Sequence, residues 1–215
     1  MGKWRKKASV PVVVHLDHGQ DYETVAKAIA AGYSSVMYDG SALPFEENVK
    51  NTKDVVKLGH GFGVSVEGEI GSVGYSDVAQ NHGRLTDPQE AKEFAERTGV
   101  DALAVAVGTT HRMETQSASV DYPLIETIQG LVRQPLVMHG STGLPDKDLR
   151  QISQMHFCKV NIGTAIRMRF GHSLRKAMQK KPDVFDRLEL MKEPMREVKE
   201  EAINKMKLLQ ANLMN

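Results

Sequence analysis

The chain of 215 residues has a single cysteine, Cys158, so no disulfide can form within it. Proteins without disulfides are typical of reducing compartments, and we expect a cytoplasmic location. No apolar run approaches the roughly 20 residues that a membrane-spanning helix needs. The first residues are basic but lack the apolar segment of a secretory signal, so we expect no association with a membrane.

Neither sign of charge is in excess, because 28 Lys and Arg residues face 27 Asp and Glu residues and the net charge is +1. Nucleic-acid-binding proteins carry a basic excess, so this balance argues against a nucleic acid as partner. The length suffices for one large α/β domain with its own apolar core. We expect a single domain over residues 1–215, with C-terminal helices over residues 165–215.

Apolar strands that end in histidine recur at three distant places in the sequence. They are residues 12–17 before His18, residues 103–110 before His111, and residues 136–138 before His139. The first is typical of a strand buried on both faces in a parallel sheet, and such folds place their chemistry at the carboxyl ends of strands. If the three strands are neighbours, their imidazoles can bind one zinc ion, which in catalytic sites takes three protein ligands.

Strands and helices alternate along the chain, which predicts six βα units. Right-handed crossovers would make these strands neighbours in sequence order. Polar residues at nearly every strand end favour an α/β fold of the TIM (β/α)8 type, with about six of its eight βα units, over an open sheet. We expect strands at residues 12–19, 35–38, 64–70, 103–110, 136–138 and 159–164, and helices at residues 22–31, 44–58, 87–98, 122–132, from 145, 165–179 and 194–211.

Carboxylates and glycine-rich loops accompany the predicted strand ends. Asp17 suits general acid–base catalysis beside a metal-bound substrate, or it orients a ligand histidine. Asp39 and Glu69 suit an ancillary cation or hydrogen bonds to the ligand histidines; alternatively they are buried acids paired with a lysine or with backbone. The loops at residues 139–143 and 161–164 suit a phosphate group, which backbone N–H groups and hydroxyls would bind.

Six motifs in this order resemble those of the class II, zinc-dependent ketose-bisphosphate aldolases, which include fructose- and tagatose-bisphosphate aldolases. The resemblance runs from about residue 8 to residue 170. The motifs are HLDHG at 15–19, VMYDGS at 36–41 with LPFEEN at 43–48, VEGE at 66–69, GTTH at 108–111, HGSTG at 139–143 and KVNIGT at 159–164.

The resemblance implies reversible aldol cleavage of a phosphorylated sugar, a ketose 1,6-bisphosphate, to dihydroxyacetone phosphate and glyceraldehyde 3-phosphate. It implies zinc as a Lewis acid on His18, His111 and His139, and Asp17 as the proton donor to the aldehyde-side hydroxyl. Asp39 and Glu69 match a second metal position, for a divalent or a monovalent cation. The positions matching the dihydroxyacetone-phosphate site are Gly140, Ser141, Thr142, Asn161, Ile162, Gly163 and Thr164.

Three departures from the family's pattern leave an alternative open. First, the chain lacks the family's first two βα units. Second, Tyr75 replaces a glycine in a loop where the family has a Glu-Asp pair, and this chain has only Asp77 there. Third, Arg112 replaces a glycine near the phosphate. Arg112 can bind the phosphate itself or obstruct it. The alternative is a truncated, catalytically impaired aldolase relative that binds metal or oligomerises. A metal-dependent hydrolase on a related barrel is a third candidate, but no carboxylated lysine or Asp-rich metal bridge is evident.

Association with further copies is a further expectation, because unpaired strand edges of an incomplete barrel template pairing. We expect a homo-oligomer, or a chain whose terminal helices cover the gap. The last helix carries an apolar stripe that predicts packing on the barrel or a subunit interface. The stripe consists of Met195, Val198, Ala202, Met206 and Leu209.

Overall fold

The computed structural model describes residues 10–78 and 83–209. It divides them into two units. The first comprises the described residues up to Ser72, with Arg84–Val107 and Asp121–Val137; the second comprises the described part of Val73–Gly83, Gly108–Val120 and the described residues from Met138. None of the described helices is both long and apolar enough to cross a membrane.

The main sheet has six strands in the order β1-β2-β3-β6-β7-β8, with β4 and β5 in a separate two-stranded sheet. The pairings from β1 to β7 are parallel. This order confirms the expected α/β fold of the (β/α)8 type with six βα units, because each crossover leads to the next strand. The strands are β1 (His15–Gly19), β2 (Ser35–Tyr38), β3 (Ser65–Ile70), β6 (Ala102–Val105), β7 (Leu136–Met138) and β8 (Phe157–Val160).

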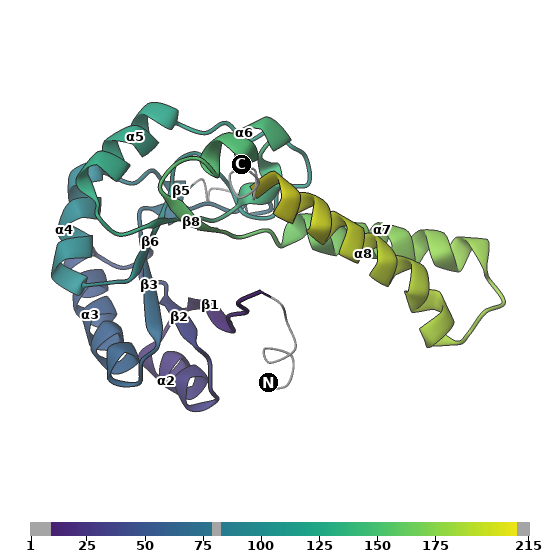
Figure 1. Cartoon of the computed structure of the whole chain (residues 1–215), viewed down its shortest axis with the longest axis horizontal. Helices are drawn as coiled ribbons and strands as arrows, with labels where there is room; N and C mark the ends of the chain where they lie inside the picture. Colours follow the sequence, from purple (N-terminus) through teal and green to yellow (C-terminus); the bar gives the residue numbers. More distant parts are fainter. Residues whose placement is uncertain (1–9, 79–82, 210–215) are drawn as a thin grey trace. The chain divides into compact units, whose positions relative to one another are not determined.

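Four helices of the first unit follow its strands: α2 (Tyr22–Ala30), α3 (Phe45–Gly61), α4 (Pro88–Thr98) and α5 (Tyr122–Leu131). Figure 1 shows α2, α3 and α4 along one face of β1, β2 and β3. Aspartates begin three of these helices, since the side chains of Asp21, Asp87 and Asp121 accept hydrogen bonds from backbone N–H groups of the first turn. Such caps satisfy donors that have no partner within the helix.

Apolar side chains fill both faces of the sheet in the first unit. Met37, Ala104 and Val137 come from three strands and form one fully buried cluster. On the helical side, Phe94 of α4 is fully buried. It lies so close to Gly68 that a Cβ atom there would be 2.9 Å from the ring. The burial of both faces is what a parallel sheet requires, because helices cover it.

The first strand differs from the expectation of a strand buried on both faces from residue 12. β1 starts at His15, and Val12 and Val13 are 41% and 61% exposed. Among the described residues, β1 is the end of the sheet and pairs with β2 alone. A strand at an edge has one neighbour fewer, so its apolar run stays in contact with solvent.

The predicted polar loop after Gly71 contains two short strands, β4 (Ser72–Val73) and β5 (Gly83–Arg84), which pair with each other. Gly71 has a φ of +77°, and a Cβ atom there would lie 2.5 Å from the hydroxyl of Thr86. The turn into this hairpin therefore requires glycine. Residues 79–82 of the predicted loop lie outside the described residues.

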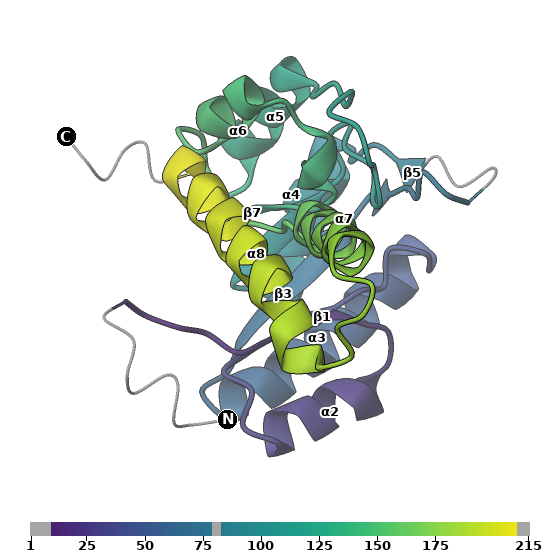
Figure 2. The same ribbon diagram turned by 90° about the vertical axis from the view of Figure 1, so that its right-hand side faces the viewer.

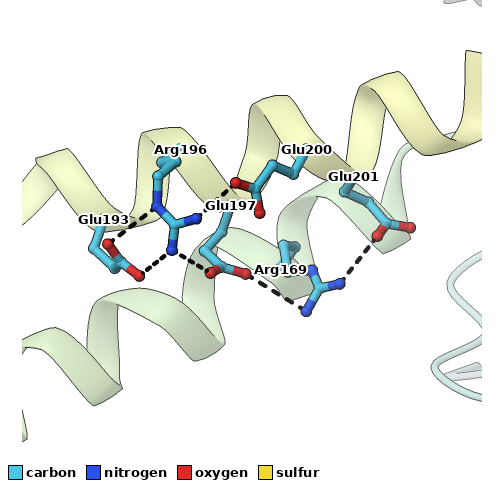
Figure 3. A network of polar contacts seen from close by, with 6 residues as sticks. All are labelled: Arg169, Glu193, Arg196, Glu197, Glu200 and Glu201. Atoms are coloured by element: carbon cyan, nitrogen blue, oxygen red, sulfur yellow. Dashed lines mark hydrogen bonds and ion pairs between the residues drawn. The ribbon is translucent and has the colours of Figure 1, made fainter.

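The second unit contains η1 (Ser141–Gly143), α6 (Asp146–Ile152), α7 (Thr164–Lys180) and α8 (Arg187–Leu209), besides β8. The last two helices lie side by side (Figures 1 and 2). Arg169 of α7 pairs with Glu197 at 3.6 Å and with Glu201 at 3.3 Å, both on α8 (Figure 3). Glu197 also pairs with Arg196, so the contact between the helices is part of a larger network.

The predictions for α8 need two corrections. The helix begins at Arg187 rather than Pro194, and Pro194 lies inside it and is buried. The second correction concerns part of the predicted apolar stripe, because Met195 and Met206 are exposed whereas Val198, Ala202 and Leu209 are partly buried. The stripe therefore does not pack along its whole length, and the alternative of a subunit interface stays a prediction. Lys205, beside the stripe, pairs with Asp146 of α6 at 3.0 Å.

Replacing Phe94 tests the packing between α4 and the sheet. We expect Phe94→Ala to lower the free energy of unfolding by about 3–5 kcal/mol, since it removes a fully buried ring and leaves a cavity. Phe185→Ala is the control, because that ring is 96% exposed and its loss should change stability by less than about 0.5 kcal/mol. Denaturant unfolding of both variants measures the difference, and equal effects would contradict the described packing.

Candidate active site

His18 stands at the carboxyl end of β1 and is held by groups from β1 and β2. Its Nδ1 atom lies 2.7 Å from Oδ2 of Asp39, the residue that follows β2. Its backbone has a φ of 51°, a left-handed conformation that is rare outside glycine. The backbone N–H of Asp39 donates to the carbonyl of Gly19 at 2.8 Å, which keeps the two strand ends in register. The strand ends thus bring the predicted His18 and Asp39 together.

The charges at this point favour an ionised pair. Burial alone lowers the pKa of His18, but the hydrogen bond to Asp39 and the charges of Glu69, Asp39 and Asp17 outweigh burial and raise it. For Asp39, burial raises the pKa, but hydrogen bonds from His18 and Ser41 lower it to about 2. Ser41 donates both its backbone N–H, at 3.1 Å, and its hydroxyl, at 2.7 Å, to Oδ1 of Asp39.

Glu69 adds a third ligand-type group to this cluster. Its carboxylate is 3.9 Å from Nδ1 of His18, and the residue is only 2% exposed. One donor atom from each of His18, Asp39 and Glu69 lies within 4.8 Å of the others. Two carboxylates and an imidazole suit a divalent cation, and charges buried to this degree are paired or coordinate metals. The residues predicted for the second metal position therefore lie together in the first unit.

Asp17, the predicted proton donor, is exposed on β1. Its charge contributes to the raised pKa of His18, so the two groups interact electrostatically. Successive residues of a strand point to opposite sides, which separates Asp17 from its neighbour His18 in direction. The exposure of Asp17 to solvent is compatible with a group that exchanges protons.

The second unit brings His111 and His139 together. Their rings are 5.8 Å apart, edge to face at 72°. His139 follows β7 and is fully buried, and its Nδ1 atom lies 3.2 Å from the side-chain amide of Asn161, after β8. An amide in this place fixes the orientation of the imidazole, as partners of metal-binding histidines do.

His111 contacts Tyr75, which stands where the family's pattern has a glycine. The two rings are stacked with centroids 4.8 Å apart and an angle of 23° between their planes. Residues 75 and 111 also form an isolated parallel β-bridge. The signal missed in the sequence is therefore a pairing between segments that no local pattern connects.

The glycine-rich loops of the second unit contact each other. The hydroxyl of Ser141 donates to the carbonyl of Asn161 at 2.5 Å, and that of Thr142 accepts from the backbone N–H of Ala165 at 3.2 Å. Gly140 has a φ of 65°, and a Cβ atom there would lie 2.7 Å from the backbone of Thr110. The remaining predicted phosphate-binding residues, Ile162, Gly163 and Thr164, lead from β8 into the first residue of α7.

Arg112 lies beside this region and is engaged by Asp77. Its Nη1 atom donates to Oδ2 of Asp77 at 2.8 Å, and both side chains are 51% exposed. This ion pair raises the pKa of Arg112 and lowers that of Asp77. Arg112 also has a φ of 59°, which fits a position where the family has glycine.

Further polar groups and two cavities lie outside the clusters described so far. The buried Glu67 lies 3.5 Å from His15, on the same strands as Glu69 and His18. Glu67 comes two residues before Glu69, and His15 comes three residues before His18. A cavity of about 890 Å³ between α2 and α3 contains none of the predicted site residues. A cavity of about 360 Å³ in the second unit includes Thr142, together with Arg169 and Lys205.

Comparisons with known proteins agree on one family. The family model described as "Fructose-bisphosphate aldolase class-II" matches residues 1–212. A probable fructose-bisphosphate aldolase of Bacillus subtilis (strain 168) is 40% identical over 203 residues, which are 94% of this chain and 71% of that protein. The YdjI aldolase of Escherichia coli K12 has a crystal structure with a TM-score of 0.77 and 36% identity, covering 95% of this chain and 71% of that chain. The crystal structure of a putative fructose-1,6-bisphosphate aldolase of Coccidioides immitis has a TM-score of 0.83 and 29% identity, and the match covers 96% of this chain and 74% of that chain.

Replacing Asp39 by asparagine tests the His18–Asp39 pair in metal-free protein. The pKa of Asp39 is about 2 in the folded protein, below its ordinary value of 3.8. The ionised carboxylate therefore stabilises the fold above pH 3.8, and this stabilisation is lost as the pH falls toward 2. The pKa of His18 is raised, so its effect on stability depends on pH in the opposite direction. The stabilisation that protonated His18 contributes is lost as the pH rises through that pKa. We expect the free energy of unfolding of the wild type to exceed that of Asp39→Asn by about 2 kcal/mol near pH ~5, and by less at lower and at higher pH.

Unfolding by denaturant across this pH range measures the difference. Asp54→Asn is the matched control, because Asp54 is an exposed aspartate of α3 that lies 4.0 Å from Lys50. A difference between wild type and Asp39→Asn that does not change with pH would contradict the ionised pair.

Proposed function

The chain belongs to the class II fructose-bisphosphate aldolase family of lyases, and from this we propose that it catalyses the reversible cleavage of a ketose 1,6-bisphosphate. The substrate is fructose- or tagatose-1,6-bisphosphate, and the products are dihydroxyacetone phosphate and glyceraldehyde 3-phosphate. The observation that carries this proposal is the clustering of metal-ligand side chains: His18 with Asp39 and Glu69, and His111 with His139.

We propose that His18, His111 and His139 hold zinc and that Asp39 and Glu69 hold a second divalent or a monovalent cation. The donor set fits, since imidazole suits zinc and carboxylate suits harder cations. Asn161 beside His139 and Asp39 beside His18 are the orienting partners that such ligands use. When bound, zinc supplies a Lewis acid that polarises a carbonyl oxygen.

The other residues have roles in proton transfer and in binding the substrate. Asp17 exchanges the proton of the hydroxyl next to the bond that breaks. Hydroxyl and backbone N–H groups of the two glycine-rich loops bind the phosphate of the dihydroxyacetone-phosphate half, with Ser141, Thr142 and Thr164 as the hydroxyl donors. Arg112 supplies a positive charge for a phosphate group.

One observation favours the alternative of a relative that binds metal but is catalytically impaired. The only acid of loop residues 74–78 is Asp77, and its carboxylate is engaged by Arg112 at 2.8 Å. A carboxylate held in this way is a poor acceptor for the proton that enolisation releases. In this alternative the metal cluster persists and turnover does not.

We also propose that the chain forms a homo-oligomer in the cytoplasm. Exposed apolar residues support the oligomer, namely Val12 and Val13 before the edge strand, and Leu188 and Met195 on α8. An unpaired strand edge is a template for association between chains. Analytical ultracentrifugation that detects only monomers at micromolar concentration would refute it.

Metal analysis combined with a cleavage assay tests the proposed reaction. We expect about one tightly bound zinc per chain and aldol cleavage of fructose or tagatose 1,6-bisphosphate. Asp17→Asn should keep the zinc while kcat falls about 10²–10⁴-fold, because it removes a general acid–base group. His139→Asn should lose both zinc and cleavage.

His156→Asn is the control for the loss of a histidine, because His156 is exposed and outside both clusters. It should keep zinc and cleavage. Zinc without cleavage of either sugar in the wild type would favour the impaired relative. A wild-type chain that binds no metal would refute the metal-dependent reaction and leave an impaired relative that oligomerises.

A further inference from the structure

In the second unit, the ring of Tyr75 contacts two other side chains. The ring of Tyr75 lies on the imidazole of His111, with centroids 4.8 Å apart and planes at 23°. The guanidinium carbon of Arg112 lies 5.0 Å from the centroid of the same tyrosine ring. Tyr75 therefore contacts a proposed zinc ligand and a cation, and both contacts are of kinds that aromatic rings favour.

The backbone holds the two stacked rings in register. The N–H of His111 donates to the carbonyl of Gly74 at 2.7 Å, and the N–H of Ser76 donates to the carbonyl of His111 at 3.1 Å. These hydrogen bonds make residues 75 and 111 direct partners in a parallel bridge. Side chains of paired residues lie on the same face and contact each other.

An ion pair between Arg112 and Asp77 connects the two segments that carry the stacked rings. Asp77 accepts a hydrogen bond from Nη1 of Arg112 at 2.8 Å. Asp77 lies two residues after Tyr75, and Arg112 directly follows His111, so the ion pair connects the same two segments as the bridge. The left-handed φ of 59° at Arg112 persists because these contacts hold the residue.

We propose that Tyr75 is a positioning residue that fixes the imidazole of His111 by stacking, and that the Asp77–Arg112 ion pair holds Tyr75 in place. The consequence for zinc rests on the proposed function, but the stack itself does not. Partners that orient a ligand histidine affect metal affinity, and their loss costs about 10–100-fold. Tyr75 thus does for His111 what Asn161 does for His139.

Variants of Tyr75 separate the stacking from other effects of the side chain. Tyr75→Phe keeps the aromatic face, whereas Tyr75→Ala removes it; Tyr75→Leu keeps apolar bulk without a ring and serves if the alanine variant does not fold. Asp77→Asn breaks the ion pair. Glu90→Gln is its matched control, because Glu90 pairs with Arg84 at a similar distance of 2.9 Å, on an exposed surface outside the stack.

The first measurement is the NMR spectrum of the His111 ring in metal-free protein. We expect ring protons shifted by the tyrosine ring current in wild type and in Tyr75→Phe, and the loss of that shift in Tyr75→Ala and Tyr75→Leu. Identical His111 shifts in all four proteins would overturn the proposal, whether or not the chain binds zinc.

The second measurement is zinc affinity by competition with a chelator. We expect Tyr75→Ala and Tyr75→Leu to bind about 10–100-fold more weakly than wild type, Tyr75→Phe to stay within about threefold, and Asp77→Asn to lie between. Glu90→Gln should match wild type. If Tyr75→Phe weakened zinc binding as much as Tyr75→Ala, a role for stacking would be refuted. A wild type that binds no zinc would refute the proposed function, and the NMR result would still decide whether Tyr75 stacks on His111.

Discussion

The hydrogen bond between His18 and Asp39 is the contact on which the first unit's site depends. It joins the ends of β1 and β2 at 2.7 Å, and it lets two carboxylates and an imidazole share a largely buried space. A buried carboxylate such as Glu69 would be costly without a positive charge near it. The fold provides that charge by placing strand ends side by side, since parallel strands in sequence order bring their carboxyl ends to the same edge. The site is thus a consequence of topology first and of individual residues second.

The histidines of the second unit are held by a different physical device. His139 is oriented by the amide of Asn161, a polar neighbour in a buried position, whereas His111 is stacked on an aromatic ring. Both devices fix the orientation of an imidazole ring, as the partners of metal-binding histidines do. Under the proposed function, both arrangements orient ligands of the same zinc ion. The tyrosine that replaces a family glycine then need not be a defect, because it makes contacts that a glycine cannot make.

Much of this was predictable from the sequence, and the residues that were not share a cause. Asp39 and His139 directly follow apolar runs, and a run of that kind specifies both a strand and its carboxyl end. The expected strand over residues 103–110 was too long, because β6 ends at Val105 and His111 lies six residues beyond it. The stack of Tyr75 on His111 was not predictable, because the bridge joins segments that are distant in sequence. The exposure of Met195 and Met206 on α8 was not predictable either, since it depends on which distant segments the helix contacts. The exposure of Val12 depends on how many strands flank β1, which the local pattern of residues does not encode.

Pro194 has a consequence for the long helix α8 that concerns its cooperativity. A proline has no N–H, so the carbonyl of Leu190 receives no hydrogen bond from the residue four positions later, and the ladder of α8 is interrupted there. The turns before the break can therefore melt without pulling apart those that follow. The glutamates that pair with Arg169, Glu197 and Glu201, both lie after the break. The two ion pairs of Arg169 therefore belong to the continuous part of the helix, whereas the pair of Glu189 with Lys181 at 2.8 Å lies before the break.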